Sequence, residues 1–310
     1  MTVYQFQQAS SEHPDRCEDA ILVSPGNGKA PVFAVIDGMG GHQHQLASGE
    51  LLTGREAAQA IRNVLIEDLE HFPASASAAP GDETEQRVIA GLTRAHQHVY
   101  NDLNGGDGVP LRNRIGAVLT AVVVCENGGR LLVTQIGDSR GYLLTDGELI
   151  QLCQDEDNIE YLVRQHGLSE ADAARISAIL NSYDGVNEPL AEGTIMLGGQ
   201  KYDMYMAWRW FLVGNPALNI PASNVVINAL GTSKIDPIAE KSRIEVSAGD
   251  KLCLCSDGLY KNLTDAEILA GLQTSDDPAK ALGEAAWARS QDRSNRRMDP
   301  DDISVIVVTF

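Results

Sequence analysis

Acidic residues stand at the ends of several apolar runs in this 310-residue chain. The acids concerned are Glu18-Asp19 before residues 20–23, Asp37 after 32–36, Asp138 after 130–136, Asp257 after 251–256 and Asp301-Asp302 before 303–310. Carboxylates gathered on one rim repel one another unless a cation neutralises them. Oxygen-only ligands suit hard ions such as Mg²⁺ and Mn²⁺. Each acid alone is more simply an exposed turn residue, so the pattern needs further support.

The elements that would position these acids are mostly strands. β-Branched runs bounded by Gly, Asn and Asp predict strands at 20–23, 32–36, 117–125, 130–136, 141–145, 148–152, 242–246, 251–256 and 303–310. Asn127-Gly128 and Asp146-Gly147 predict hairpin turns, hence antiparallel pairing. Apolar periodicity predicts helices over 46–69, 83–103 and 158–180, and Thr264 to Glu267 forms a capping box. The predicted class is α+β, with antiparallel sheets covered by helices.

Bulk composition limits the partners. The net charge is −19, from 43 acids and 24 bases, which disfavours nucleic acid and anionic membranes. Five scattered cysteines form no disulfide framework or zinc motif; Cys253 and Cys255 share one strand face and predict core packing. The first residues lack the pattern of a signal peptide. We expect a cytoplasmic monomer that binds neither nucleic acid nor membrane.

An ordered set of motifs resembles the metal-dependent protein phosphatases, the PPM or protein phosphatase 2C family. The matching stretches are RCEDA (16–20), VIDGMGGH (35–42), GAVLTAVVV (116–124), IGDSRGYLLTDGELIQL (136–152), NVVINALG (224–231), LCSDGLYKNLTDAEI (254–268) and DDISVIVV (301–308). Each motif alone is weak, but their order is specific. The resemblance implies one domain over residues 1–310, built as a four-layer α-β-β-α sandwich with a metal site at one end.

The same resemblance implies the site residues and the reaction. It implies two Mn²⁺ or Mg²⁺ ions held by Glu18, Asp19, Asp37, the Gly38 carbonyl, Asp257 and Asp301, with Asp138 near a third, weaker ion. Asp37 would bridge the two main ions. Through water activated by these ions, Asp37, Asp257 and Asp301 would support hydrolysis of phosphoserine or phosphothreonine proteins without a phosphoenzyme. Arg140 is expected to brace the local structure.

Several positions depart from the family pattern. Many relatives have a phosphate-binding Arg where Pro14 stands, so Arg16 is an open candidate for that role. Lys261 replaces an Asp four residues after Asp257, which puts the third ion in doubt. Asp155-Glu156-Asp157 replaces a usual Asp-His pair. The pairs His42/His44 and His96/His98 have spacings that favour structural roles over zinc binding.

Residues 155–223 correspond to a variable flap beside the active site of relatives. Six of the chain's sixteen aromatic residues lie between 182 and 223. They could form a local core, while the alternation over 205–210 suggests an added strand with one outward face. Our hypothesis is that the segment selects the protein substrate. The alternative function is a catalytically weak PPM-like module that binds phosphoproteins or regulates a partner.

Overall fold

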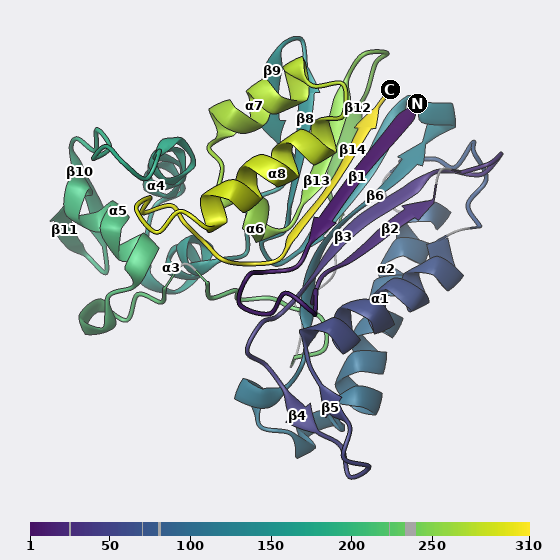
Figure 1. Ribbon diagram of the computed structural model, residues 1–310, viewed down its shortest axis with the longest axis horizontal. Coiled ribbons are helices and arrows are strands. Elements are labelled where there is room, and N and C mark those ends of the chain that lie inside the picture. Colours follow the sequence, from purple (N-terminus) through teal and green to yellow (C-terminus); the bar gives the residue numbers. More distant parts are fainter. Residues whose placement is uncertain (25, 70, 80–81, 223, 233–239) are drawn as a thin grey trace.

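Two five-stranded antiparallel sheets form the centre of the structure, a computed structural model (Figure 1). It describes residues 1–24, 26–69, 71–79, 82–222, 224–232 and 240–310. Sheet A has the order β1 (Thr2–Gln8), β14 (Ile303–Thr309), β13 (Lys251–Cys255), β8 (Arg140–Thr145), β9 (Glu148–Gln151). Sheet B has the order β12 (Glu240–Glu245), β7 (Arg130–Ile136), β6 (Ala117–Cys125), β3 (Val32–Gly38), β2 (Ala20–Ser24).

Strand alternation divides the core into layers. In β3, Phe33 and Val35 pack between the two sheets, while Val32, Ala34 and Ile36 face the helices that cover sheet B. Successive side chains of a strand point to opposite faces, so two buried faces require this nearly continuous apolar run. Strand β14 alternates in the same way on sheet A.

Helices cover the outer face of each sheet (Figure 1). The helices on sheet B are α1 (Gly54–Leu69) and α2 (Glu83–Gln97), the latter continued by a π-helical turn (His98–Leu103). Those on sheet A are α6 (Asp257–Tyr260), α7 (Asp265–Thr274) and α8 (Pro278–Ser290). Short 3₁₀ turns span Gly106–Gly108, Leu111–Asn113, Glu126–Gly128 and Pro216–Leu218. The predicted four-layer sandwich is confirmed, as are the capping box and core cysteines.

Some boundaries differ from the sequence predictions. Strand β1 was not predicted, because TVYQFQQ carries few β-branched residues; it pairs along its whole length with β14. The first helix begins at Gly54 rather than 46, and Leu51 lies in the short strand β5 (Leu51–Leu52), paired with β4 (His44–Gln45). The helix predicted over 158–180 is two helices, α3 (Asn158–His166) and α4 (Glu170–Ser182). They separate at Gly167, whose φ of 67° ends the first.

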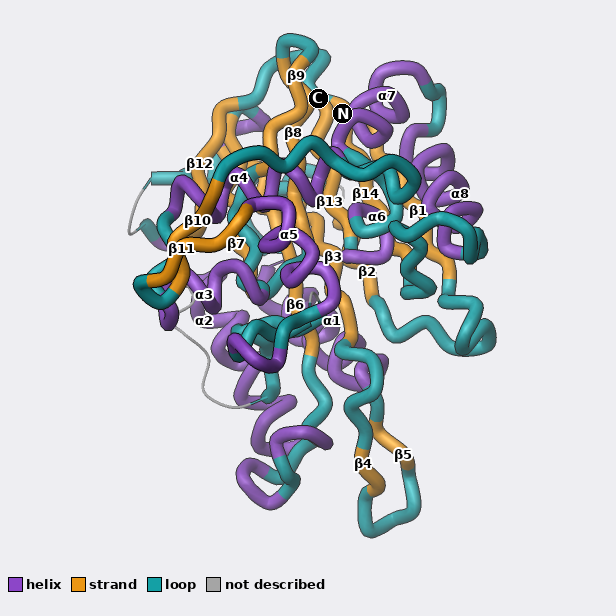
Figure 2. Tube along the Cα trace, turned by 90° about the vertical axis from the view of Figure 1, so that its left-hand side faces the viewer, coloured by secondary structure: helices purple, strands orange, loops and turns teal. Residues whose placement is uncertain are grey.

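The flap segment, residues 155–223, stands to the left of the sandwich in Figure 1 and in front of it in Figure 2, and it has a core of its own. It contains α3, α4, β10 (Thr194–Leu197), β11 (Gln200–Asp203) and α5 (Met204–Val213); residue 223 lies outside the described residues. The strand predicted over 205–210 is wrong, because this stretch forms α5. The buried residues of α5 are Met204, Ala207, Trp208 and Phe211, which is helical spacing. The local core was the better of the two interpretations.

No helix among the described residues is long and apolar enough to cross a bilayer.

Candidate active site

Asp37 is the second-last residue of β3. It continues the alternation of Phe33 and Val35, so its side chain lies on the face of sheet B that meets sheet A. Gly38 follows at a point of close backbone approach. A Cβ atom there would lie 2.4 Å from the Glu18 carbonyl oxygen and 2.6 Å from the Gly54 backbone, so only glycine fits.

Asp302 holds the Glu18-Asp19 segment in place. Its carboxylate accepts hydrogen bonds from the backbone N–H of Ser10 at 2.6 Å and of Glu18 at 2.5 Å. Glu18 and Asp19 are both buried directly before β2. No role was predicted for Asp302 from the sequence. The available signal was its place beside Asp301, directly before the apolar run 303–310.

Asp257 and Asp301 come from neighbouring strands of sheet A. Asp257 begins α6, two residues after the end of β13, and Asp301 lies two residues before β14. Gly258 makes the close approach possible, since a Cβ there would lie 2.1 Å from the Asp302 carbonyl oxygen. Asp301 in turn accepts the backbone N–H of Asp302 at 2.7 Å. The mutual effects of their charges show that the sheets bring together Asp19, Asp37, Asp257 and Asp301. We define the acid cluster as these four residues with Glu18, which directly precedes Asp19 in the chain.

Burial and mutual repulsion make this cluster hard to ionise. The pKa of Asp37 is raised well above its ordinary value by burial and by the charges of Asp19, Asp257 and Asp301. Burial, followed by the charge of Asp302, raises the pKa of Asp19 to about 8. Burial and then Asp257 raise the pKa of Asp301 to about 9. A cation bound here would relieve the repulsion.

Two oxygens of the cluster have no protein partner. Asp19 Oδ2 and Asp257 Oδ1 are buried without a hydrogen bond. A buried, unsatisfied polar atom is costly unless a ligand satisfies it. These carboxylate donors therefore fit hard divalent cations. Within the described ranges, however, no three His, Cys, Asp or Glu side chains converge into a ready metal-binding group.

Arg16 lies beside the acid cluster and forms an ion pair with one of its members, Glu18. Its guanidinium is 2.8 Å from the Glu18 carboxylate, and 36% of its side chain is exposed. Burial raises the pKa of Glu18, while the charges of Arg16 and His13 oppose that shift. The phosphate-binding role of Arg16 stays a prediction.

Asp138 lies next to the acid cluster with Tyr260 and Lys261. Tyr260 donates a hydrogen bond to Asp138 at 3.3 Å, and Lys261 Nζ is 2.5 Å from Asp257 Oδ2. Burial is the main cause that raises the pKa of Asp138 to about 7, against the attraction of Lys261. Arg140 is buried, pairs with Asp155 at 2.6 Å and stacks 3.7 Å from the Tyr260 ring. Its predicted bracing role is confirmed.

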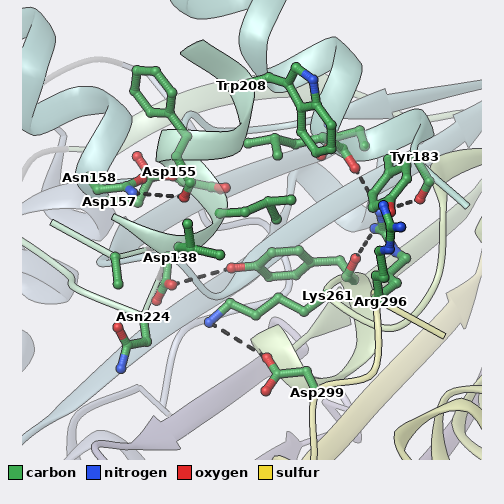
Figure 3. A pocket seen from close by; sticks show the side chains of 18 of the residues that line it. Asp138, Asp155, Asp157, Asn158, Tyr183, Trp208, Asn224, Lys261, Arg296 and Asp299 are labelled. Carbon is green, nitrogen blue, oxygen red and sulfur yellow. Dashed lines mark hydrogen bonds and ion pairs between the residues drawn. The ribbon is translucent and has the colours of Figure 1, made fainter. Parts of the chain in front are cut away.

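A cavity of about 740 Å³ separates this part of the site from the flap segment (Figure 3). Asp138, Lys261 and Asp299 line one side, and Tyr183 and Trp208 line the other. Asp157, also in the lining, caps the N-terminus of α3 and accepts hydrogen bonds from the backbone N–H groups of Ile159 and Glu160. The flap segment therefore faces Asp138 and Lys261, which lie next to the acid cluster, across a space large enough for part of a peptide.

The motif Asp155-Glu156-Asp157 has a structural role that its sequence did not predict. Glu156 accepts the backbone N–H of Gly137 and the side-chain amide of Asn228, each at 3.0 Å. It thereby joins the GDSR turn to the segment after the flap. The histidine pairs also serve structure, for example His44, which contacts the carbonyls of Asn113 and Leu103.

Comparison with known proteins supports a family assignment. The serine/threonine protein phosphatase PstP of Mycobacterium tuberculosis is 26% identical over 278 residues, 90% of this chain but 40% of PstP. The serine/threonine phosphatase stp of Listeria innocua is 23% identical over 255 residues, 81% of this chain and 75% of stp. This chain thus spans less than half the length of PstP.

A solved structure shares the fold. The crystal structure of the catalytic domain of PstP in complex with two manganese ions has a TM-score of 0.60 and 23% identity, over 99% of this chain and 96% of that one. The family model described as protein phosphatase 2C matches residues 9–299. Because that match covers nearly all of it, the chain belongs to the protein phosphatase 2C family.

Proposed function

We propose that the chain is a metal-dependent serine/threonine phosphoprotein phosphatase. The observation that carries the proposal is the acid cluster, in which buried carboxylates from both sheets meet and two oxygens lack a partner. Its relatives PstP and stp are named serine/threonine phosphatases, and the PstP catalytic domain was crystallised with two manganese ions. Oxygen donors suit either Mn²⁺ or Mg²⁺.

The residues that would hold two ions are those of the acid cluster together with the Gly38 carbonyl. When bound, such ions lower the pKa of water and offset the charge of a phosphoryl group. The protein positions the side chains that would bind these ions. Asp302 holds the Glu18-Asp19 segment through two backbone hydrogen bonds, and the Gly38–Gly54 contact holds the end of β3. These ions would also offset the repulsion between a phosphoryl group and a chain of net charge −19.

Arg16 is proposed as the phosphate-binding side chain. Its side chain is 36% exposed and already pairs with Glu18, and from there the guanidinium could pair with a phosphoryl oxygen instead. Arg16→Lys keeps the charge but loses the two-pronged geometry. We expect that change to raise KM more than it lowers kcat.

The function is tested with a phosphothreonine peptide and para-nitrophenyl phosphate, each with Mn²⁺ and with a chelator. A phosphotyrosine peptide of the same sequence serves as the control for substrate class. We expect Mn²⁺-dependent hydrolysis of the phosphothreonine peptide and of para-nitrophenyl phosphate, with much slower attack on phosphotyrosine. Equal rates in chelator would contradict metal dependence. Binding of the phosphopeptide without turnover would favour the alternative, a regulatory module.

A further inference from the structure

Lys261 occupies a place where carboxylates from three parts of the chain meet. It stands directly after α6, one helical turn beyond Asp257, and its backbone N–H bonds to the Asp257 carbonyl at 2.9 Å. Its Nζ is 2.5 Å from Asp257 Oδ2 and 4.0 Å from Asp299 Oδ2. Figure 3 shows the side chain reaching between Asp138 and Asp299.

The Lys261 side chain is enclosed rather than solvated. Only 16% of it is exposed, and it lines the cavity below the flap segment. Burial acts to lower its pKa, but the charges of Asp257, Asp138 and Asp299 raise the pKa well above its ordinary value. With its Nζ 2.5 Å from Asp257 and 4.0 Å from Asp299, the side chain pairs with these carboxylates as an ammonium group, the ordinary form of lysine.

The two oxygens of Asp257 are used differently. Oδ2 accepts the Lys261 ammonium, whereas Oδ1 is buried without a hydrogen bond. A single carboxylate can serve a protein cation with one oxygen and a metal ion with the other. An ion on the Lys261 side would have to displace or face the ammonium, which like-charge repulsion opposes.

We propose that Lys261 supplies a fixed positive charge in place of the third divalent ion that the family resemblance puts beside Asp138. The chain then binds two ions rather than three, and Asp257 offers Oδ1 to one of them. This inference rests on the proposed function, because it presupposes the two main ions. Asp138 and Asp299 become partners of the ammonium group rather than metal ligands.

The test is the number of Mn²⁺ ions per chain, measured by native mass spectrometry at several metal concentrations. We expect two ions in the wild type, and three in Lys261→Asp, which restores an acid among Asp138, Asp257 and Asp299. The matched control is Lys280→Met, which removes an exposed lysine of α8 paired with Glu284. It should leave the number at two.

A second measurement covers the case in which Lys261→Asp does not fold. In chelator, Lys261→Met should lower the unfolding temperature by several degrees, because buried carboxylates lose their cation. Lys261→Arg, which keeps the charge, should recover most of that loss. An unchanged unfolding temperature in Lys261→Met would overturn the inference.

The stoichiometry separates this inference from the proposed function. Three ions in the wild type, or two in a folded Lys261→Asp, would overturn the role of Lys261 while leaving the phosphatase proposal intact. No bound ion in the wild type, with no turnover, would overturn the proposed function and this inference with it.

Discussion

The acid cluster and the flap segment are stabilised in opposite ways. In the flap segment, apolar side chains such as Phe211 and Ile176 are fully buried, and its helices begin with satisfied caps at Asp157, Ser169 and Asp203. In the acid cluster, buried carboxylates repel one another and two oxygens lack a partner. The surrounding sheets keep the acids of the cluster together, whereas the flap segment is stabilised by its own apolar core.

This difference indicates which part of the sequence is constrained by function rather than by stability. Local stability alone would not select the acid cluster, since charged groups buried together destabilise a fold. This composition is explained if a ligand binds the folded state and offsets the repulsion between the carboxylates. The flap segment needs no ligand to explain its core, so any functional role must lie in its exposed positions.

The largest effect is expected from removing one charge of the acid cluster. Asp257→Asn keeps the size of the side chain but loses a charged ligand. Turnover of para-nitrophenyl phosphate should fall at least about 10²–10³-fold, the scale for one electrostatic group in an active site. Asp37→Asn and Asp301→Asn should behave alike. Asp276→Asn, at an exposed acid between α7 and α8, is the control. Wild-type turnover in folded Asp257→Asn would refute the assignment of the cluster.

On the flap side, the largest effect is expected on stability. Phe211 is fully buried in the core of the segment, so Phe211→Ala should cost about 3–5 kcal/mol of local unfolding free energy. Hydrogen exchange should show faster exchange in α3, α4 and α5, with protection kept in β3, β6 and β14. Val213→Ala, at a side chain that is 77% exposed, should change little. Loss of protection in all elements at once would show that the flap segment is not a separate unit.

The pH dependence without metal provides a further contrast. Asp19 and Asp301 have pKa values of about 8 and about 9 in the fold, against an ordinary value of about 4. The folded chain then holds more protons than the unfolded chain, so these groups make stability fall as pH rises from about 4 to about 9. In chelator, Asp301→Asn should flatten this decline and be more stable than the wild type at the upper end. If stability fell equally with pH in the wild type and in Asp301→Asn, ionisation of Asp301 would not destabilise the fold as predicted.

The smallest effect concerns substrate choice by the flap segment. Tyr205 is half-buried on α5, with the exposed Arg209 stacked 6.0 Å from its ring. Tyr205→Ala should reduce kcat/KM on a phosphoprotein substrate about tenfold, as for a modest interface residue. Turnover of para-nitrophenyl phosphate should stay nearly unchanged. A matching loss on both substrates would assign the helix to the fold rather than to recognition.

Sequence patterns predicted the sandwich better than the flap. Two buried faces demand long apolar strands such as 117–125, and hairpin turns at Asn127-Gly128 and Asp146-Gly147 fixed their pairing. Residues 205–210 fit both period 2 and period 3.6, and only tertiary packing of Trp208 and Phe211 decides for the helix. Strand β1 depends on pairing with β14, a contact about 300 residues away in sequence that no local pattern reveals.

The same limit applies to the site. Strand ends predicted which acids approach one another, since each follows or precedes a recognisable apolar run. The roles of Asp302 and Glu156 depend on hydrogen bonds between distant segments, such as Asp302 to Glu18, and spacing does not show these. Lys261 was visible as a departure from the family pattern, but its pairing with Asp257 and Asp299 required the structure.

The most direct test of the account is a crystal structure with bound manganese, using anomalous scattering to locate the ions. We predict two peaks per chain within the acid cluster, in contact with Asp37, Asp257 and Asp301, and no peak between Asp138, Lys261 and Asp299. A chain that hydrolyses phosphothreonine peptide with no manganese peak at the cluster would contradict the account.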